Sequence, residues 1–281
     1  MTFSTAIRSD IAGRSATTDA RLLVSRRTTV SAVIPTLNEA ENLPHVLARL
    51  PDCVDEVIIV DGHSTDDTVG VAKTLRPDAR VVLQNRRGKG NALACGFAAA
   101  TSDIIVMLDA DGSTDPAEIP AFLAPLLEGA DFAKGSRYLH GGGSSDITRV
   151  RSAGNRILGF AVNVLFGTSY TDLCYGYNAF WRHCLPYMQV TCDGFEVETV
   201  INIRIAQAGL STTEVPSREQ ARISGQSNLR AWKDGRRVLN TIVAERFRRR
   251  LEPGNAWHPH YDEMLPDYPL GDRVAISSAG A

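Results

Sequence analysis

The stretch Val106-Met107-Leu108-Asp109-Ala110-Asp111 decides the fold, because an apolar run stops there at two carboxylates one residue apart. The run 104–108 indicates a strand buried on both faces, as in parallel sheets. Ligands of open α/β sheets bind beyond the carboxyl ends of such strands. We expect Asp109 and Asp111 to point the same way, since side chains repeat every two residues on an extended backbone. Converging carboxylates suit a hard divalent cation such as Mg2+ or Mn2+, although Asp-x-Asp is also common in turns and helix caps.

Strand-like and helix-like segments alternate on both sides of this stretch. The predicted strands are 30–35, 56–61, 79–83, 104–108, 131–138, 175–181 and 211–216. The predicted helices are one capped by 38–41 that runs to about 50, then 66–75, 89–100, one that begins at Pro116, 150–167 and 195–208. This alternation predicts right-handed βαβ units, and therefore an α/β fold with a mostly parallel sheet and helices on both faces. The glycine- and serine-rich loop 140–145 is interpreted as a mobile lid.

The composition favours a globular protein with one large domain and argues against several classes of function. The 281 residues are 43% hydrophobic and 22% charged, enough to bury a sizeable core. A formal net charge of −2 argues against a nucleic-acid partner. The five cysteines form no CxxC pair and are odd in number, which suggests neither a zinc site nor a disulfide framework. A reducing, cytoplasmic compartment fits this pattern.

Four segments follow from the distribution of apolar and charged residues. We expect a flexible tail at 1–29, a catalytic domain at 30–228, a basic amphipathic helix at 229–251 and a second flexible tail at 252–281. No stretch reaches the roughly 18 apolar residues of a membrane-spanning helix. The segment 229–251 holds eight Lys and Arg against two acidic residues, with Trp and Phe among its apolar residues. It suits either peripheral contact with an anionic membrane or packing on the domain with a solvated charged face.

Polar clusters follow three predicted strands, so we expect one shared ligand at that sheet edge. The chain carries P-x-L-N-E at 35–39, V-D-G-x-S-T-D-x-T at 60–68, R-x-G-K-G at 86–90 and D-A-D at 109–111. This order resembles the nucleotide-sugar half of family 2 inverting glycosyltransferases with the Rossmann-like GT-A fold. Later motifs resemble the branch of dolichol-phosphate mannose synthases and polyprenyl-phosphate sugar transferases: Gly135-Ser136-Arg137-Tyr138, Arg151, 172–177, 196–198 and 222–227. Together the motifs cover about 30–229.

The resemblance implies a donor site built from the early motifs. Three residues would cradle the nucleoside, with the third bonding ribose: Pro35, Leu37 and Glu39. The base would face Asp61, and Lys89 with its glycine neighbours would support the base or diphosphate, unless Lys89 is only a solvated helix start. Asp109 and Asp111 would position the diphosphate through Mg2+ or Mn2+, with Asp111 the more direct ligand. Two positions depart from the pattern, because Gly62 replaces a second acid of many relatives and Ser113 replaces a glutamine of the mannose synthases.

The resemblance also implies roles on the acceptor side. Arg137 and Arg151 would hold an acceptor phosphate, since a guanidinium binds phosphate oxygens bidentately, although Arg151 is equally a surface charge at a helix start. A phosphate nucleophile needs no general base. A hydroxyl acceptor would need one, and the candidates are Asp172, Asp193 and Glu196. Arg222 would stabilise the departing diphosphate.

The expected function is metal-dependent, inverting transfer of a hexose from a nucleoside-diphosphate sugar to a polyprenyl phosphate at the cytoplasmic membrane face. One alternative is transfer by the same fold to a soluble hydroxyl or phosphorylated acceptor. A more distant alternative is a noncatalytic membrane-surface adaptor that uses the basic helix. The pattern leaves the base, the sugar and the oligomeric state open.

Overall fold

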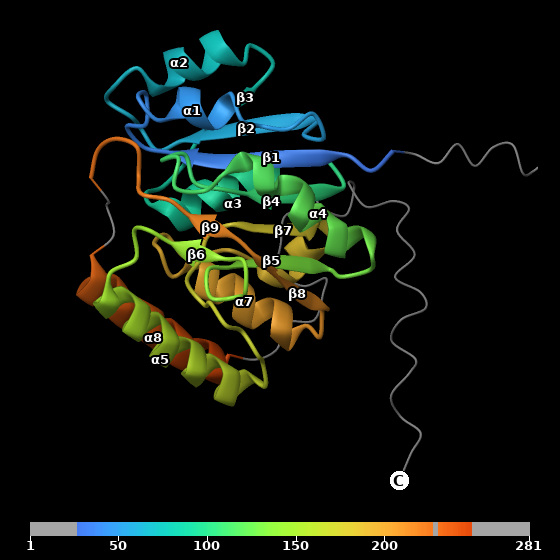
Figure 1. Cartoon of the computed structure of the whole chain (residues 1–281), viewed down its shortest axis with the longest axis vertical. Coiled ribbons are helices and arrows are strands. Elements are labelled where there is room, and N and C mark those ends of the chain that lie inside the picture. Colours follow the sequence, from blue (N-terminus) through green and yellow to red (C-terminus); the bar gives the residue numbers. More distant parts are fainter. Residues whose placement is uncertain (1–26, 227–229, 249–281) are drawn as a thin grey trace, which may run out of the picture.

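A seven-stranded sheet with the order β3-β2-β1-β4-β7-β5-β8 forms the centre of the computed structural model, which describes residues 27–226 and 230–248 (Figure 1). Its strands are β1 (Val30–Thr36), β2 (Glu56–Asp61), β3 (Arg80–Leu83), β4 (Ile104–Met107), β5 (Phe132–Ser136), β7 (Asn178–Trp181) and β8 (Thr212–Pro216). A separate ribbon pairs β6 (Gly143–Ser144) with β9 (Arg218–Glu219). Most of the predicted tails at 1–29 and 252–281 lies outside the described residues.

The predicted helices occur in the predicted order, most of them with shorter bounds, and the short α6 was not predicted. They are α1 (Leu43–Leu47), α2 (Thr68–Leu75), α3 (Lys89–Ala99), α4 (Ile119–Leu127), α5 (Arg149–Phe166), α6 (Leu185–Met188), α7 (Val197–Gln207) and α8 (Ala231–Phe247), with 3-10 turns η2 (Pro116–Glu118) and η3 (Arg182–Cys184). The helix predicted at 229–251 is α8, and position 229 and positions 249–251 lie outside the described residues. Within the described ranges, no helix has the length and apolar character needed to cross a membrane.

The sheet is mostly parallel, as predicted. β1 pairs in parallel with β2 and β4, β2 with β3, and β5 with β8. β7 is inserted between β4 and β5 and runs antiparallel to both, which the sequence did not indicate. The carboxyl ends of β1, β2 and β4 therefore meet at one edge, where we expected a shared ligand.

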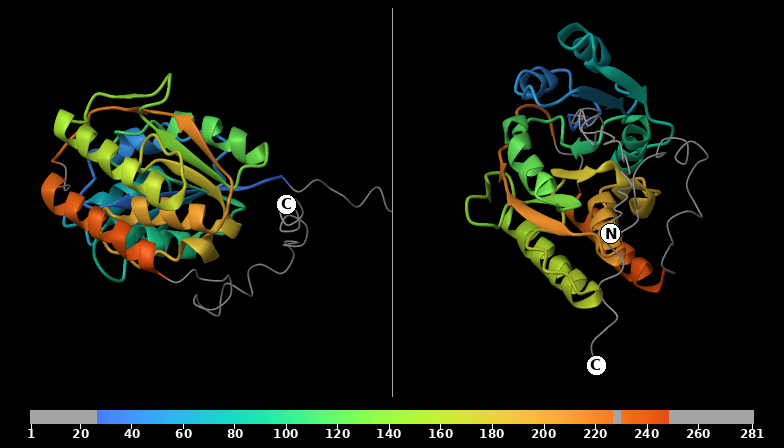
Figure 2. Two further views of the ribbon diagram at one scale, coloured as in Figure 1. Left: turned by 90° about the horizontal axis from the view of Figure 1, so that it is seen from below. Right: turned by 90° about the vertical axis from the view of Figure 1, so that its right-hand side faces the viewer.

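Both faces of the sheet are covered, because alternate residues of each central strand point to opposite sides. In β4, Ile104 and Val106 join a core cluster with residues of α1 and α4, whereas Ile105 and Met107 join another with residues of α3 and α7. Figure 2 shows the helices on the two sides of the sheet. The predicted helices on both faces are confirmed.

α5 and α8 lie side by side beyond these layers (Figures 1 and 2). Their inner faces form a third apolar cluster that contains Val162 of α5, Val238 and Ile242 of α8, and Ile203 of α7. The helix pair is thus attached to the domain mainly through α7.

The loop predicted as a free lid is tied down in the structure. Gly141 has a left-handed φ of 97°, which a glycine adopts without strain, and the chain then pairs Gly143 and Ser144 with Arg218 and Glu219. The interpretation as a mobile lid is therefore corrected, because backbone pairing with β9 holds this segment.

Candidate active site

The loops after β1 and β2 are cross-linked at the predicted sheet edge. Asn38 adopts a left-handed backbone with φ of 57°, and its side-chain oxygen accepts a hydrogen bond from the Thr65 amide at 2.8 Å. The Glu39 amide donates to the Thr68 hydroxyl at 2.9 Å. The two motifs therefore form one wall, and several of their polar residues serve to join the loops.

Asp61 is buried with one carboxylate oxygen engaged. Its Oδ2 accepts from the amides of His63 at 3.0 Å and Ser64 at 3.1 Å. Its Oδ1 has no hydrogen-bond partner within the described residues, although the residue is only 4% exposed. A buried acceptor without a partner is costly, so this oxygen marks a place where the N–H of a ligand would bind.

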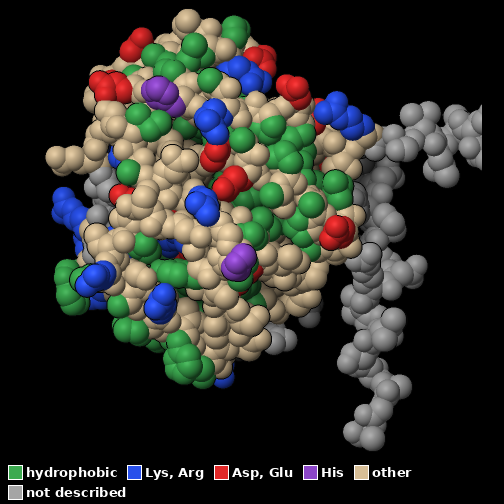
Figure 3. Space-filling view, viewed as in Figure 1, with side chains coloured by type: hydrophobic (Ala, Val, Ile, Leu, Met, Phe, Trp, Pro, Cys, Tyr) green, Lys and Arg blue, Asp and Glu red, His purple; other side chains and the backbone are tan. Residues whose placement is uncertain are grey.

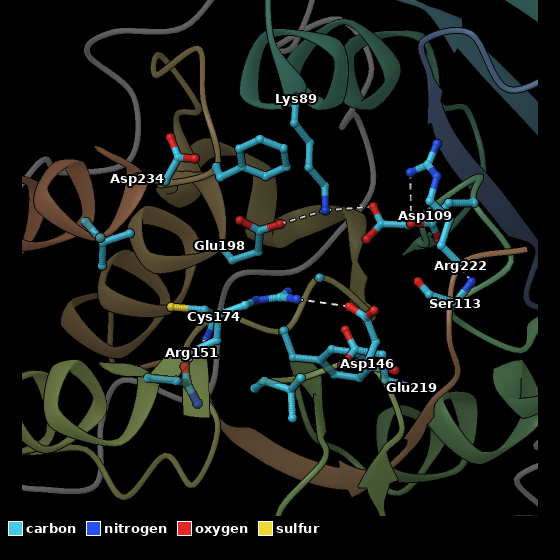
Figure 4. Close-up of a pocket in the computed structure, with 18 of the residues that line it drawn as sticks. Lys89, Asp109, Ser113, Asp146, Arg151, Cys174, Glu198, Glu219, Arg222 and Asp234 are labelled. Carbon is cyan, nitrogen blue, oxygen red and sulfur yellow. Dashed lines mark hydrogen bonds and ion pairs between the residues drawn. The ribbon is translucent and has the colours of Figure 1, made fainter. Parts of the chain in front are cut away.

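Lys89 lies between two carboxylates (Figure 4). Its Nζ is 2.6 Å from Asp109 Oδ1 and 2.8 Å from Glu198 Oε1. Burial opposes the charged lysine, but the two carboxylates outweigh it and raise the pKa of Lys89. Burial also raises the pKa of Glu198 above its ordinary value, and Lys89 offsets part of that rise. The alternative interpretation of Lys89, as only a solvated helix start, is therefore wrong.

Arg222 joins the loops after β1 and β4. Its guanidinium contacts Glu39 through one amino group and lies 3.3 Å from Asp111 Oδ2 through the other. Burial raises the pKa of Glu39, while Asn42 and Arg222 favour the charged form. The Ile223 amide donates to the Asp111 carbonyl at 3.1 Å, which fixes this segment over the sheet edge.

A cavity of about 1460 Å³ connects Lys89, Arg222 and Glu39, whereas the buried Asp61 is not among its lining residues and only the neighbouring Gly62 is. Its donor end is lined by most of the residues predicted to bind the nucleotide sugar: Pro35, Leu37, Glu39, Lys89, Asp109 and Asp111. The same cavity extends between α5 and α8, where Arg151, Ile157, Trp232 and Leu239 line it. One continuous space therefore joins a charged sheet edge to an apolar helix pair.

Residues 31–185 match the family model described as Glycosyl transferase family 2. The chain belongs to this family. It is 34% identical over 227 residues to glycosyltransferase AglJ of Haloferax volcanii, with 78% of this chain and 71% of the relative covered. It is 30% identical over 223 residues to undecaprenyl-phosphate mannosyltransferase of Micrococcus luteus, with 75% and 91% covered.

Solved structures agree with this assignment. Glucosyl-3-phosphoglycerate synthase from Mycobacterium tuberculosis, in complex with Mn2+, UDP and glucosyl-3-phosphoglycerate, matches with a TM-score of 0.63 and 28% identity over 78% of this chain and 80% of that one. Another crystal structure of the same synthase holds Mg2+ and UDP. The sheet and its helices are therefore the GT-A domain of a family 2 glycosyltransferase.

The charges at the donor end of this family 2 enzyme suit a divalent cation. Four carboxylates against two cations leave a formal charge of −2: Glu39, Asp109, Asp111 and Glu198 against Lys89 and Arg222. The side chains of Asp109 and Asp111 are 30% and 21% exposed in the cavity, so hard oxygen ligands are accessible. Residues 27–226 and 230–248 contain no ready cluster of three His, Cys, Asp or Glu for a metal.

The glycines around Lys89 serve packing. The Gly90 amide donates to the Asp193 carbonyl at 3.0 Å, and a Cβ on Gly90 would lie 2.5 Å from the Cys192 carbonyl oxygen. A Cβ on Gly88 would also collide with the Asp193 carbonyl. Their bare Cα positions let α3 approach the backbone at 192–193. Gly88 also lines the cavity, so the expected support of the base or diphosphate stays a prediction.

Arg137 is held by carboxylates of the protein. Its Nε is 2.7 Å from Asp172 Oδ2, its Nη2 is 2.9 Å from Asp172 Oδ1, and its Nη1 is 3.0 Å from Glu219 Oε2. Burial opposes the charges, but the pairing raises the pKa of Arg137 and lowers that of Asp172. The guanidinium fork faces Asp172, so binding of a phosphate by Arg137 requires Glu219 to move away.

Arg151 is more accessible than Arg137. It lies in the first turn of α5, where the Thr148 hydroxyl accepts from its amide at 3.2 Å. Its Nη1 is 2.9 Å from Asp146 Oδ2, and the two side chains are 25% and 40% exposed. Such an exposed pair contributes little stability, so Arg151 can exchange Asp146 for an anion in the cavity.

The structure does not bring the three candidate general bases to the cavity. Asp172 is fully buried against Arg137, Asp193 pairs with Arg86 at 2.8 Å, and Glu196 lies beside Arg237. None of these three lines the cavity, whereas Glu198 does.

The sequence motif 196–198 contains Glu198, but no role was predicted for this residue. An acidic residue near the start of an otherwise apolar helix could have indicated that it has a buried, charged partner. Glu219, the partner of Arg137, had no such signal.

Proposed function

We propose that this family 2 glycosyltransferase moves a hexose, with inversion, from a nucleoside-diphosphate sugar to a polyprenyl phosphate. The observation that carries the proposal is the continuous cavity, which joins a charged donor end to an apolar end between α5 and α8. A lipid phosphate likewise has a charged end, the phosphate, and an apolar end, the lipid chain. The similarity to undecaprenyl-phosphate mannosyltransferase over 91% of that relative supports this acceptor.

The donor would occupy the edge formed by β1, β2 and β4. The unpaired Oδ1 of Asp61 would accept an N–H of the base once the loop at Gly62, which lines the cavity, lets the base approach it, and Glu39 is suited to bind ribose hydroxyls once Arg222 releases it. Asp109 and Asp111 would hold Mg2+ or Mn2+, which when bound offsets the charge of the departing diphosphate. Lys89 keeps Asp109 in place, because its ammonium group bridges that carboxylate to the buried Glu198.

The acceptor would enter from the helix pair. Arg151 would bind the acceptor phosphate, and Arg137 would join it after Glu219 moves. A phosphate oxygen is already anionic, so it attacks the anomeric carbon without a general base while the bond to the diphosphate breaks. Arg222, when released from Glu39, would face the developing negative charge of the diphosphate. The reaction would take place at the cytoplasmic membrane face.

A second acceptor class has one specific observation in its favour. The solved relatives include a synthase complexed with glucosyl-3-phosphoglycerate, whose name describes a soluble phosphorylated compound. Arg151 would serve such an acceptor equally well. A hydroxyl of a soluble acceptor would need a base other than Asp172, Asp193 or Glu196, which are outside the cavity, and the carboxylates that do line it beyond the donor end include Asp146, Glu198 and Glu219. Membership in an enzyme family sets aside the noncatalytic adaptor.

The test is a transfer assay with UDP-, GDP- and dTDP-sugars, each with Mg2+ or Mn2+, and with undecaprenyl phosphate in detergent or 3-phosphoglycerate as acceptor. We expect a lipid-linked monosaccharide that disappears without the cation and in Asp111→Ala and Arg151→Ala. A product only with 3-phosphoglycerate would move the enzyme to the second acceptor class. No cation-dependent transfer from any donor to either acceptor would contradict the proposal.

A further inference from the structure

The outward faces of α5 and α8 expose large apolar side chains in two helical stripes. On α5 the stripe is Val150, Ile157, Phe160 and Val164, and on α8 it is Trp232, Leu239, Val243 and Phe247. The exposed fractions range from 48% for Leu239 to 88% for Trp232. Solvent-exposed side chains of this size and number on two neighbouring helices indicate an interaction surface.

The exposed charges on the two helices themselves have one sign. The two acids of α8 are turned inward, since Asp234 accepts from the Arg230 amide at 2.6 Å and Glu245 pairs with Arg204 at 2.6 Å. α5 contains no acidic residue. The exposed cations of the two helices are Arg149, Arg156, Lys233, Arg236, Arg237 and Arg246. Figure 3 shows basic and hydrophobic side chains close together on the side where α5 and α8 lie.

We propose that α5 and α8 together form a surface that binds an anionic membrane, with the apolar stripes in the lipid interface and the cations at the headgroups. The charge distribution selects this partner, because a protein partner would have to supply a matching acidic surface whereas anionic lipids supply it everywhere. The apolar cluster of Val162, Val238 and Ile242 fixes the two helices together, so they enter the interface as one unit.

The surface also defines a route for a lipid substrate. Val150 and Ile157 of α5 and Trp232 and Leu239 of α8 are all exposed, and all four line the cavity that reaches Asp109. The space between the helices therefore opens at the proposed lipid interface. The route rests on the proposed function, because only a membrane-embedded acceptor would use it. Binding of the surface to a membrane does not rest on the proposed function.

The test is flotation of the full chain with vesicles of phosphatidylcholine, with and without phosphatidylglycerol, in the absence of any sugar donor or acceptor. The variant Phe160→Ser/Phe247→Ser removes one exposed ring from each helix, and neither residue lines the cavity. Its matched control is Leu83→Ser/Leu127→Ser, which removes two exposed leucines on β3 and α4. Thermal unfolding checks that both variants fold.

We expect binding to vesicles with phosphatidylglycerol that weakens roughly tenfold or more in the phenylalanine variant and stays unchanged in the control. Failure of the wild-type chain to float, or equal loss in the control, would overturn the membrane assignment. A dimer in solution that the phenylalanine variant dissolves would assign the surface to a second copy instead. Because the assay contains no substrate, its outcome is independent of whether undecaprenyl phosphate proves to be the acceptor.

Discussion

The two ends of the cavity are built in different ways. At the donor end, short loops leave a rigid sheet and are joined by ion pairs, so that Lys89 and Arg222 each contact two carboxylates. At the other end, α5 and α8 are attached to the domain through an apolar cluster and the buried ion pair of Glu245 with Arg204, and their outer faces are exposed. The donor end thus depends on particular residues at particular positions, whereas the outer faces of the helix pair depend only on being apolar and basic.

This difference predicts how each end responds to substitution. A single change at the donor end disturbs an interlocked group of charges and close backbone contacts. A comparable change in the helix pair alters one exposed side chain among several. Predictions that follow from this contrast run from the largest expected effect to the smallest.

Lys89→Met should have the largest effect, because it leaves Asp109 and the buried Glu198 without their shared cation. We expect a loss of about 3–5 kcal/mol in the free energy of unfolding near neutral pH. The pKa of Glu198 is already raised by burial, so the folded variant binds a proton more readily than the unfolded chain. The deficit should therefore be smallest below the ordinary glutamate pKa of 4.5 and should grow as pH rises.

Chemical unfolding at several pH values measures this effect. The double variant Lys89→Met/Glu198→Gln is the control, because it removes the group that titrates. A Lys89→Met variant whose stability deficit is equal at acid and neutral pH would show that Glu198 does not depend on Lys89 for its charge.

Asp111→Asn should come next, through activity. This carboxylate is accessible in the cavity, and its removal takes one charge from the proposed cation site. We expect transfer to fall about 100- to 1000-fold with little loss of stability. Glu128→Gln, an exposed acid just after α4, is the matched control in the same transfer assay. Transfer equal to that of the wild type in Asp111→Asn would remove Asp111 from the site.

Gly90→Ala tests the close packing of the donor end. The new Cβ would lie 2.5 Å from the backbone oxygen of Cys192, which cannot rotate away. We expect a loss of about 1–3 kcal/mol in stability, measured by urea unfolding. An unchanged midpoint would mean that the backbone at 192–193 adapts and that this end is less rigid than the contacts indicate.

Gly154→Ala is the corresponding change in the helix pair and should have the smallest effect, of opposite sign. Gly154 lies inside α5, and nothing is within 4 Å of its added Cβ. We expect a gain of about 0.5–1 kcal/mol, because alanine favours a helix interior more than glycine does. A loss of stability in the same urea experiment would show that α5 is packed closely at Gly154, and would contradict the view that the helix pair tolerates substitution better than the donor end.

The sequence predicted which loops meet at the donor end because its signals are local. Apolar runs that stop at Asp61 and Asp109 identify strand ends, and parallel pairing then brings their loops together. The antiparallel direction of β7 could not be predicted, because it depends on a chain path of many residues between β5 and β7. The same holds for the pairing of Arg137 with Glu219, which are 82 positions apart. The outward stripe of α5 has a visible helical spacing, but only the packing shows that its face stays exposed.

Lys89 also bears on how this sequence can change over time. One ammonium group stabilises both the buried carboxylate of Glu198 in α7 and the loop that carries Asp109. Its removal therefore leaves two carboxylates without their ion pair. A lineage could lose it only together with Glu198, through an intermediate that is less stable. The outer residues of α5 and α8 carry no such linkage and are free to drift within apolar and basic types. Variation among acceptors should therefore arise at the helix pair, while the donor end is inherited as a unit.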